Sequence, residues 1–288
     1  MLAPPQSWAA ARLAYALESS RAQQRAALGL YLPVGYPTRE SNLDALHLMA
    51  ASADILELGV PHREPHLDGP VIQRAAAQAL DNGFQMDQLF ATAIELTAST
   101  TVALLAMAYW SSIEEYGPVS FARQLAAAGG GGVLVPDLPS AAASAWQRIA
   151  RDEGLYTVTL IPPHTSTAQL AAIGAATSGM VYAPAALGKT GSRHPLSPQL
   201  PRLVGRLRTA TRLPVAVGIG ISTPDRAAQA SAYADAVVVG SAVIRCMKTR
   251  LDRPALAAAD AARDFADGVR RARRPPPSLP ACRSPRHA

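Results

Sequence analysis

With 288 residues, of which 49% are hydrophobic, the chain can bury a full core, and its length suits two ordinary domains or one large α/β barrel. Of its 27 basic residues, six are arginines within residues 269–288, a segment without acids; the other 21 equal the number of acids, so a nucleic-acid-binding patch is not expected outside this tail. The two cysteines are too few for a disulfide framework and no apolar run approaches the ~20 residues of a membrane span, so we expect a cytoplasmic protein that binds neither nucleic acid nor membrane.

Short apolar segments rich in β-branched residues alternate with longer, Ala-rich segments of helical period. This alternation is typical of successive β-α units around a parallel sheet. Eight strands are expected: Leu28–Pro33, Asp54–Leu58, Thr101–Met107, Gly132–Val135, Tyr156–Ile161, Gly179–Tyr182, Val215–Gly218 and Ala236–Val239. The helices expected between them include Arg39–Ala51, Gly69–Asn82, Pro118–Ala128, Ser140–Asp152, Thr165–Ala175, Ser197–Thr211 and Thr223–Tyr233.

Eight strands, each followed by a helix within about 250 residues, match a TIM barrel better than an open, doubly wound sheet. We therefore expect an α/β fold in which residues 1–272 form a single TIM (β/α)8 barrel. A helix before Leu28 should cover the bottom of the barrel, and Leu251–Val269 should form the last helix. Residues 273–288 should be a disordered, basic Arg/Pro-rich tail.

Two acids stand eleven positions apart in the stretch LELGVPHREPHLDGP: Glu57 at the end of the second strand and Asp68 in the following loop. TIM barrels keep their chemistry at the C-terminal ends of the strands. An acid that ends an apolar strand there should be partly desolvated, which raises its pKa toward the range used in general acid–base catalysis. Two carboxylates in different environments could divide the acid and base roles. The alternative is a solvated charged loop, which we prefer for His62, Arg63 and His66.

The last two strands each end in glycine followed by small or hydroxyl residues that lead into a helix, in PVAVGIGIS and VVVGSAV. Backbone N–H groups freed by glycine, together with a helix N-terminus, can bind an anion, and TIM barrels commonly place a phosphate after strands seven and eight. The expected donors are Gly218, Gly220, Gly240 and Ser241. The alternative is that these glycines only form tight turns. A phosphate-anchored substrate beside two carboxylates implies proton-transfer chemistry, such as aldol cleavage, isomerisation or dehydration.

Three other patterns suggest ligand binding and are not favoured. His62, Glu64 and His66 alternate as metal ligands might, but no further cluster has familiar zinc spacing, so no metal site is expected. Gly188-Lys189-Thr190 resembles part of a P-loop, yet Gly191 and Pro195 follow where a helix should begin, and a mobile active-site loop fits better. The run of glycines at residues 129–132 precedes a strand and predicts a helix-to-strand turn.

The ordered motifs LELGVP…DGPVIQ, AYW…YG, VPDLP, GKTG, VGIGIS and VVVGSA resemble those of the tryptophan synthase α chain, over about Gly29 to Cys246. The resemblance implies a TIM barrel that splits indole-3-glycerol phosphate into indole and glyceraldehyde 3-phosphate without cofactor or metal. It further implies a possible partner, the pyridoxal-phosphate-dependent β subunit of tryptophan synthase.

The resemblance also assigns roles to residues. Glu57 matches the glutamate that protonates the indole ring carbon and helps to deprotonate the glycerol hydroxyl, and Asp68 matches the aspartate that bonds the indole N–H. Positions around the substrate are matched by Tyr31, Tyr109, Tyr182 and Thr190. Phosphate-binding positions are matched by Gly191, Ile219, Gly220, Gly240 and Ser241.

Four departures from the family pattern stand in two loops and in the GKTG segment. Glu64 replaces a usual aspartate, His62-Arg63 an aromatic-serine pair, Ser111-Ser112 an Asn-Pro pair, and Lys189 a usual valine. Three of the four fall on surfaces that the family uses for docking the β subunit, so this partnership stays open, whereas the catalytic positions are intact. The alternatives are a stand-alone lyase that releases free indole and a non-catalytic barrel that binds and activates a β-type partner.

Overall fold

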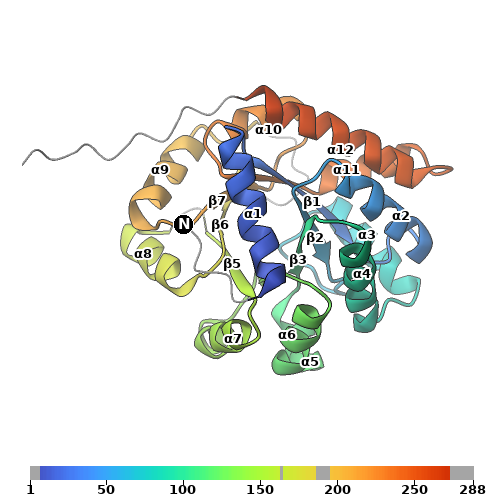
Figure 1. The fold of residues 1–288 in the computed structure, drawn as a ribbon, viewed down its shortest axis with the longest axis horizontal. Coiled ribbons are helices and arrows are strands. Elements are labelled where there is room, and N and C mark those ends of the chain that lie inside the picture. The colour runs from blue at the N-terminus through green and yellow to red at the C-terminus, as the bar shows by residue number, and fades with distance from the viewer. Residues whose placement is uncertain (1–6, 163–164, 186–194, 273–288) are drawn as a thin grey trace, which may run out of the picture.

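A computed structural model describes residues 7–162, 165–185 and 195–272. Within these residues, eight parallel strands pair in chain order and close into a barrel, which confirms the predicted TIM (β/α)8 fold (Figure 1). The strands are β1 (Ala27–Pro33), β2 (Ile55–Gly59), β3 (Ala103–Met107), β4 (Gly132–Leu134), β5 (Tyr156–Leu160), β6 (Val181–Pro184), β7 (Val215–Gly218) and β8 (Ala236–Val239).

Helices surround the barrel. They are α1 (Trp8–Ala22), α2 (Arg39–Ala50), α3 (Pro70–Asp81), α4 (Met86–Ser99), α5 (Trp110–Tyr116), α6 (Pro118–Ala127), α7 (Ser140–Asp152), α8 (Thr167–Ala176), α9 (Leu200–Ala210), α10 (Pro224–Ser231), α11 (Ser241–Thr249) and α12 (Pro254–Arg271). The expected helices are present with small shifts at their ends. No residue range had been predicted for α4, α5 and α11, although a helix was expected to follow strand eight, and α12 begins at Pro254 instead of Leu251.

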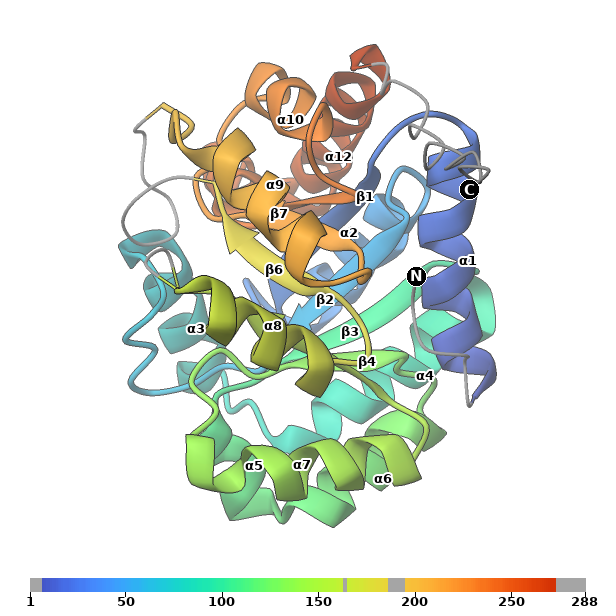
Figure 2. The same cartoon turned by 90° about the vertical axis from the view of Figure 1, so that its left-hand side faces the viewer.

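Helix α1 covers the bottom of the barrel, the end at which the strands begin, as predicted. Its N-cap Ser7 donates to the carbonyl of Gly154, just before β5, at 3.0 Å. Arg12 donates to the carbonyl of Thr100, before β3, at 3.0 Å. In Figure 1 the helix crosses in front of the strands, and the turned view of Figure 2 places it beside them, on one end of the barrel. The opposite end, where the strands finish, is therefore left for a site.

A glycine pair sets the end of α6. Gly129 has φ +90°, and the hydrogen bonds from Gly129 N–H to Ala126 and from Gly130 N–H to Leu125 close α6 in a Schellman motif. The expected helix-to-strand turn at residues 129–132 is thus confirmed, because Gly131 then leads directly into β4.

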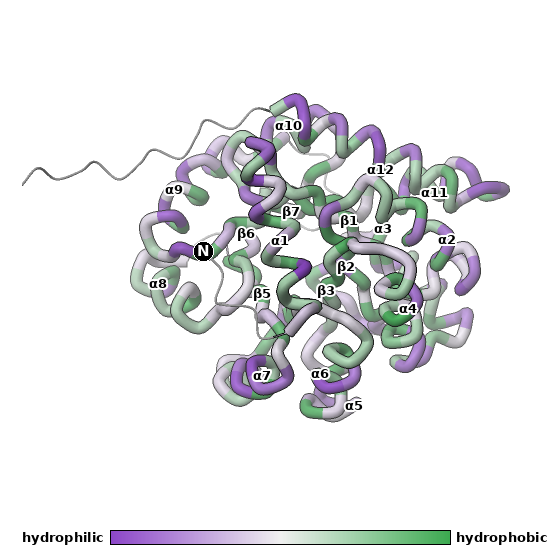
Figure 3. The backbone as a smooth tube through the Cα atoms, viewed as in Figure 1, coloured by the Kyte–Doolittle hydropathy of each residue, from purple (hydrophilic) through white to green (hydrophobic). Residues whose placement is uncertain are grey.

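The core lies inside the barrel and between the strands and the helices. Residues of β1 to β4 and of β7 and β8 are buried throughout, in keeping with a parallel sheet that helices cover. Figure 3 shows hydrophobic colour concentrated along the strands and hydrophilic colour on the outer helices.

The structure tests only part of the expected domain division. Helix α12 ends at Arg271 and belongs to the helical layer, since it packs against α2, α10 and α11. The expected tail, residues 273–288, lies outside the described residues, so the division at residue 272 stays a prediction. In the described ranges, no helix is both long and apolar enough to cross a membrane.

Candidate active site

A pocket opens where the strands end. It encloses about 650 Å³, including space open to solvent. Seven strands contribute a residue to its lining, and the segments that follow β2, β4, β7 and β8 complete it. The lining residues are Tyr31, Glu57, Leu67, Asp68, Ile72, Met107, Leu134, Pro136, Leu160, Tyr182, Ile219, Gly220, Ile221, Val238, Gly240 and Ser241. Most of these side chains are apolar, and the two carboxylates are the acidic groups that face the space, so the pocket suits a flat apolar ligand held by a few polar groups.

Glu57 projects from β2 into this pocket and is only 5% exposed. The register places it between Tyr31 of β1 and Leu105 of β3. Burial raises the pKa of the Glu57 carboxyl to about 8, and the nearby charge of Asp68 adds to the shift. At neutral pH Glu57 is therefore mainly protonated and can give a proton to a ligand in the pocket.

Asp68 reaches the same pocket from the loop between β2 and α3, and it is also 5% exposed. The Tyr109 hydroxyl donates to its Oδ2 at 3.2 Å, and the same hydroxyl accepts from the N–H of Leu67 at 3.1 Å. Asp68 also stands two residues before Pro70, the first residue of α3, where the helix dipole favours negative charge. Both features favour the ionised form of Asp68, whereas burial favours the protonated form of Glu57.

Tyr31 and Tyr182 line the pocket, as the resemblance implies for substrate-binding residues. Burial raises the pKa of both phenols, and the carboxylates add to the effect, so both hydroxyls stay protonated. Tyr109 is 1% exposed and does not belong to the lining, so its expected place around the substrate stays a prediction. Its hydroxyl donates to the Asp68 carboxylate.

Three glycines make room for the pocket tyrosines. A Cβ on Gly218 would collide with the Tyr182 ring and hydroxyl, and one on Gly59 would collide with the Tyr31 hydroxyl. A Cβ on Gly240 would lie 2.9 Å from Tyr31 Cδ1. Gly218 is not part of the pocket lining. Its close contact with Tyr182 explains why a glycine stands there, and its contact with a phosphate stays a prediction.

Four other expected phosphate ligands line the pocket: Ile219 and Gly220 after β7, and Gly240 and Ser241 after β8. Ile219 and Gly220 both have positive φ, +57° and +105°, and the first is rare for a β-branched residue. Gly240 precedes α11 and offers no side-chain cap, so N–H groups of its first turn, beginning at Ser241, are available to a ligand. A strained turn beside an uncapped helix N-terminus is suited to a phosphate.

The remaining sequence predictions fall elsewhere. Thr190 and Gly191 lie outside the described residues, so their roles stay predictions. The suspected metal ligands His62 and His66 instead pack against Tyr109, with ring centroids 5.0 and 5.4 Å away. In the described part of the chain, no three His, Cys, Asp or Glu side chains are grouped as metal ligands would be.

Sequence reasoning missed most of the apolar lining. Met107, Leu134 and Leu160 are the last residues of β3, β4 and β5, and Ile72 lies in the first turn of α3. The signal that could have found the first three was their place at the end of a predicted barrel strand: Met107 is the last residue of its predicted strand, and Leu134 and Leu160 are the last but one of theirs.

The chain matches a family model described as tryptophan synthase alpha chain over residues 17–270. The tryptophan synthase alpha chain of Streptomyces avermitilis is 41% identical over 257 residues, covering 88% of this chain and 93% of the relative. That of Acidothermus cellulolyticus is 42% identical, covering 89% and 96%. Among solved structures, Mycobacterium tuberculosis tryptophan synthase matches with a TM-score of 0.83 at 37% identity, over 90% of this chain and 98% of the other. A mutant alpha-subunit from Pyrococcus furiosus matches with a TM-score of 0.78 at 30% identity, over 85% and 99%.

Proposed function

The chain belongs to the tryptophan synthase alpha chain family, and from this premise we propose how its pocket carries out the family's reaction. The enzyme is a carbon–carbon lyase that cleaves indole-3-glycerol phosphate into indole and glyceraldehyde 3-phosphate. The observation that carries the mechanism is that two buried carboxylates with different surroundings face one pocket with an anion-binding end.

The substrate lies with its phosphate at the turn of Ile219 and Gly220 and at the start of α11. Backbone N–H groups there, with the Ser241 hydroxyl, bind the phosphate oxygens. In the segment after β6, Gly191 is proposed to complete the phosphate site and Thr190 to bond Asp68. The indole ring lies among the apolar lining residues, between the two carboxylates.

Cleavage needs a proton on the ring carbon that carries the glycerol chain, because indole leaves only once that carbon is tetrahedral. Protonated Glu57 donates this proton, and the ionised carboxylate of Asp68 accepts a hydrogen bond from the indole N–H and balances the positive charge that develops. The Glu57 carboxylate then takes the proton of the adjacent glycerol hydroxyl. The carbon–carbon bond breaks, its electron pair returns to the ring, and the hydroxyl carbon becomes the aldehyde of glyceraldehyde 3-phosphate.

We propose that the chain works as the α subunit of a tryptophan synthase, with a pyridoxal-phosphate-dependent β subunit that consumes the indole. The similarity to subunits of that name over most of their length supports this role over the stand-alone lyase and the non-catalytic barrel. The cytoplasmic location expected from the cysteine content stays a prediction.

The test is to incubate the purified chain with indole-3-glycerol phosphate and to measure indole with and without a tryptophan synthase β subunit. We expect slow cleavage by the chain alone and faster cleavage with the β subunit. No indole in either mixture would contradict the lyase function, whereas fast release that the β subunit does not change would contradict the partnership.

A further inference from the structure

The imidazole of His62 stacks on Tyr109, the residue whose hydroxyl holds Asp68. The two ring centroids are 5.0 Å apart and the planes are inclined by 17°, an offset parallel arrangement. His66 covers another part of the same ring, at 5.4 Å and 56°. The Tyr109 phenol is thus enclosed by two imidazoles on the loop that carries Asp68.

His62 is itself held at both ring nitrogens. Its Nδ1 lies 3.1 Å from the Ser112 Oγ, and its Nε2 lies 3.5 Å from the Ser111 Oγ, the second contact being at the limit of a hydrogen bond. Hydroxyls can donate or accept, so they satisfy either tautomer of the neutral ring. Burial lowers the pKa of His62, which favours that neutral ring. The two serines therefore hold the imidazole against the first turn of α5, where it stacks on the Tyr109 ring.

The bond from Tyr109 to Asp68 is sensitive to the placement of this ring. At 3.2 Å it is longer than an optimal hydroxyl–carboxylate bond, so a small displacement of the phenol would break it. The Tyr109 hydroxyl is also tied to the N–H of Leu67, next to Asp68, so the phenol orients both the carboxylate and the backbone beside it.

We propose that His62 is a positioning residue for Asp68: by stacking on Tyr109 while its ring nitrogens bond Ser111 and Ser112, it fixes the hydroxyl that orients the carboxylate. The inference deepens the proposed function, on which its kinetic consequence rests. His62 does not belong to the pocket lining, and it acts through Tyr109.

The first measurement compares the turnover of variants on indole-3-glycerol phosphate. His62→Ala removes the stack and should lower kcat by about 5- to 10-fold with KM changed less than about twofold, because a displaced carboxylate impairs chemistry more than binding. His62→Phe keeps a flat ring and should stay within about threefold of the unmodified enzyme. Arg63→Ala, a change of the exposed neighbouring side chain, is the matched control and should leave kcat unchanged.

A double-mutant cycle separates positioning from a general structural effect. If His62 acts through the Tyr109 hydroxyl, His62→Ala should cause little further loss of kcat once Tyr109→Phe has removed that hydroxyl. Additive losses, or a loss that appears in KM, would overturn the proposal. Melting temperatures of the variants identify any that fold poorly.

A second measurement does not depend on turnover. The pKa of the Asp68 carboxyl, followed by carbon NMR in 13C-labelled protein, should rise by about half a unit or more in His62→Ala, because the hydroxyl that favours the ionised form is displaced. The Arg63→Ala control should leave the pKa of the Asp68 carboxyl unchanged. An Asp68 pKa that is the same in both variants overturns the proposal even if the enzyme is active. An enzyme without activity in which this pKa still moves would contradict the proposed function and leave the positioning role supported.

Discussion

Glu57 and Asp68 are equally buried, yet their neighbours favour different protonation states. Glu57 stands on a strand among apolar and phenolic side chains, so burial raises its pKa to about 8. Asp68 stands before a helix and accepts a hydrogen bond from Tyr109, and both favour its ionised form. The chemistry needs one acid and one anion, and the surroundings, not the residue types, decide which carboxyl takes which role.

Glu57→Gln should lower kcat by at least about a hundredfold and leave substrate binding nearly intact, because the amide fills the same space but cannot transfer the proton. Steady-state kinetics and equilibrium binding of a substrate analogue measure the two effects. Glu95→Gln, on the exposed face of α4, is the control for removing one acid. Activity that survives Glu57→Gln would show that another group supplies the proton.

The pH dependence of this residue has a definite sign. The value of kcat/KM reports the pKa of the catalytic acid in the free enzyme. Because Glu57 is an acid with a pKa of about 8, kcat/KM should fall as the pH rises above about 8. Its folded pKa lies above the ordinary value of 4.5, so its contribution to stability is full below about pH 4.5 and is lost as the pH rises through about 8. Glu57→Gln should therefore raise the melting temperature more at pH 8.5 than at pH 5, and the opposite order would contradict the pKa shift.

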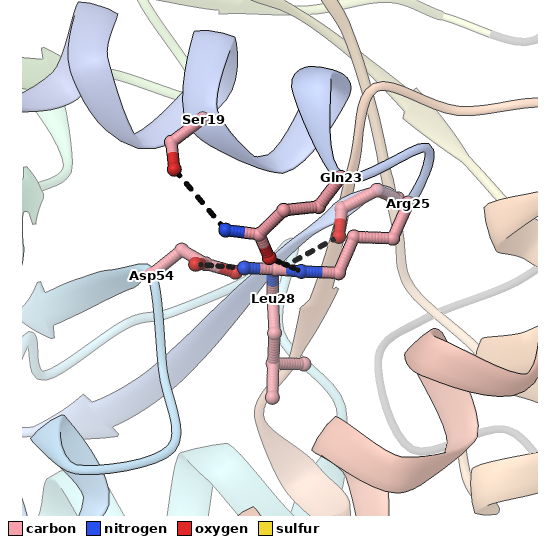
Figure 4. A network of polar contacts seen from close by, with 6 residues as sticks. Ser19, Gln23, Arg25, Leu28 and Asp54 are labelled. Carbon is pink, nitrogen blue, oxygen red and sulfur yellow. Dashed lines mark hydrogen bonds and ion pairs between the residues drawn. The ribbon is translucent and has the colours of Figure 1, made fainter. Parts of the chain in front are cut away.

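At the scale of elements, acids before two strands fasten the bottom of the barrel. Asp54, just before β2, accepts from the N–H of Leu28 in β1 at 2.7 Å and from two nitrogens of Arg25 at 2.5 and 2.8 Å (Figure 4). Asp235, just before β8, accepts from the N–H of Val215 in β7 at 2.9 Å and from Arg208 at 3.1 Å. In each case one carboxylate joins neighbouring strands where the ladder begins.

Asp54→Asn should lower the free energy of unfolding by about 2 kcal/mol, because a half-buried, bidentate charged contact is lost. It should leave kcat unchanged, since Asp54 lies at the opposite end of the barrel from the pocket. Urea unfolding and the cleavage assay measure these outcomes. Asp252→Asn, which removes an exposed acid paired with Arg253 at 3.8 Å, is the matched control and should change stability very little. An equal effect of the two substitutions would contradict the bracing role of Asp54.

At the scale of the molecule, closure of the barrel brings distant segments into one pocket and makes the last helix part of the fold. Helix α12 buries apolar residues such as Phe265 and Val269, and Gly268 packs so closely on the Pro224 carbonyl that a Cβ would collide with it. The helix packs against α2, near the other end of the chain, as well as against α10 and α11. The buried face of α12, which extends to Val269, therefore belongs to the core of the fold.

Two truncations should separate the tail from the barrel. Ending the chain after Ala272 should leave the melting temperature within about 2 °C and kcat unchanged, because it leaves the buried face of α12 in place. Ending it after Arg253 removes α12 and should prevent stable folding, since the apolar surfaces it covers become exposed. Circular dichroism melting and the cleavage assay measure both. Loss of activity in the longer chain would give the tail a function and contradict the expected division at residue 272.

The sequence by itself determined the order of strands and helices, the barrel class and the two carboxylates, because hydrophobic period, glycine turns and an acid at a strand end are local patterns. No residue range was predicted for α4, α5 and α11; one reason for α5 is that it is seven residues long and only Gly117 separates it from α6, which begins at Pro118. Only the tertiary structure decided that Tyr109 holds Asp68, 41 residues away, and that Gly218 makes space for Tyr182. It also decided that His62 stacks on Tyr109. These contacts join side chains from different strands and loops. They form only when the barrel closes and brings those strands and loops together.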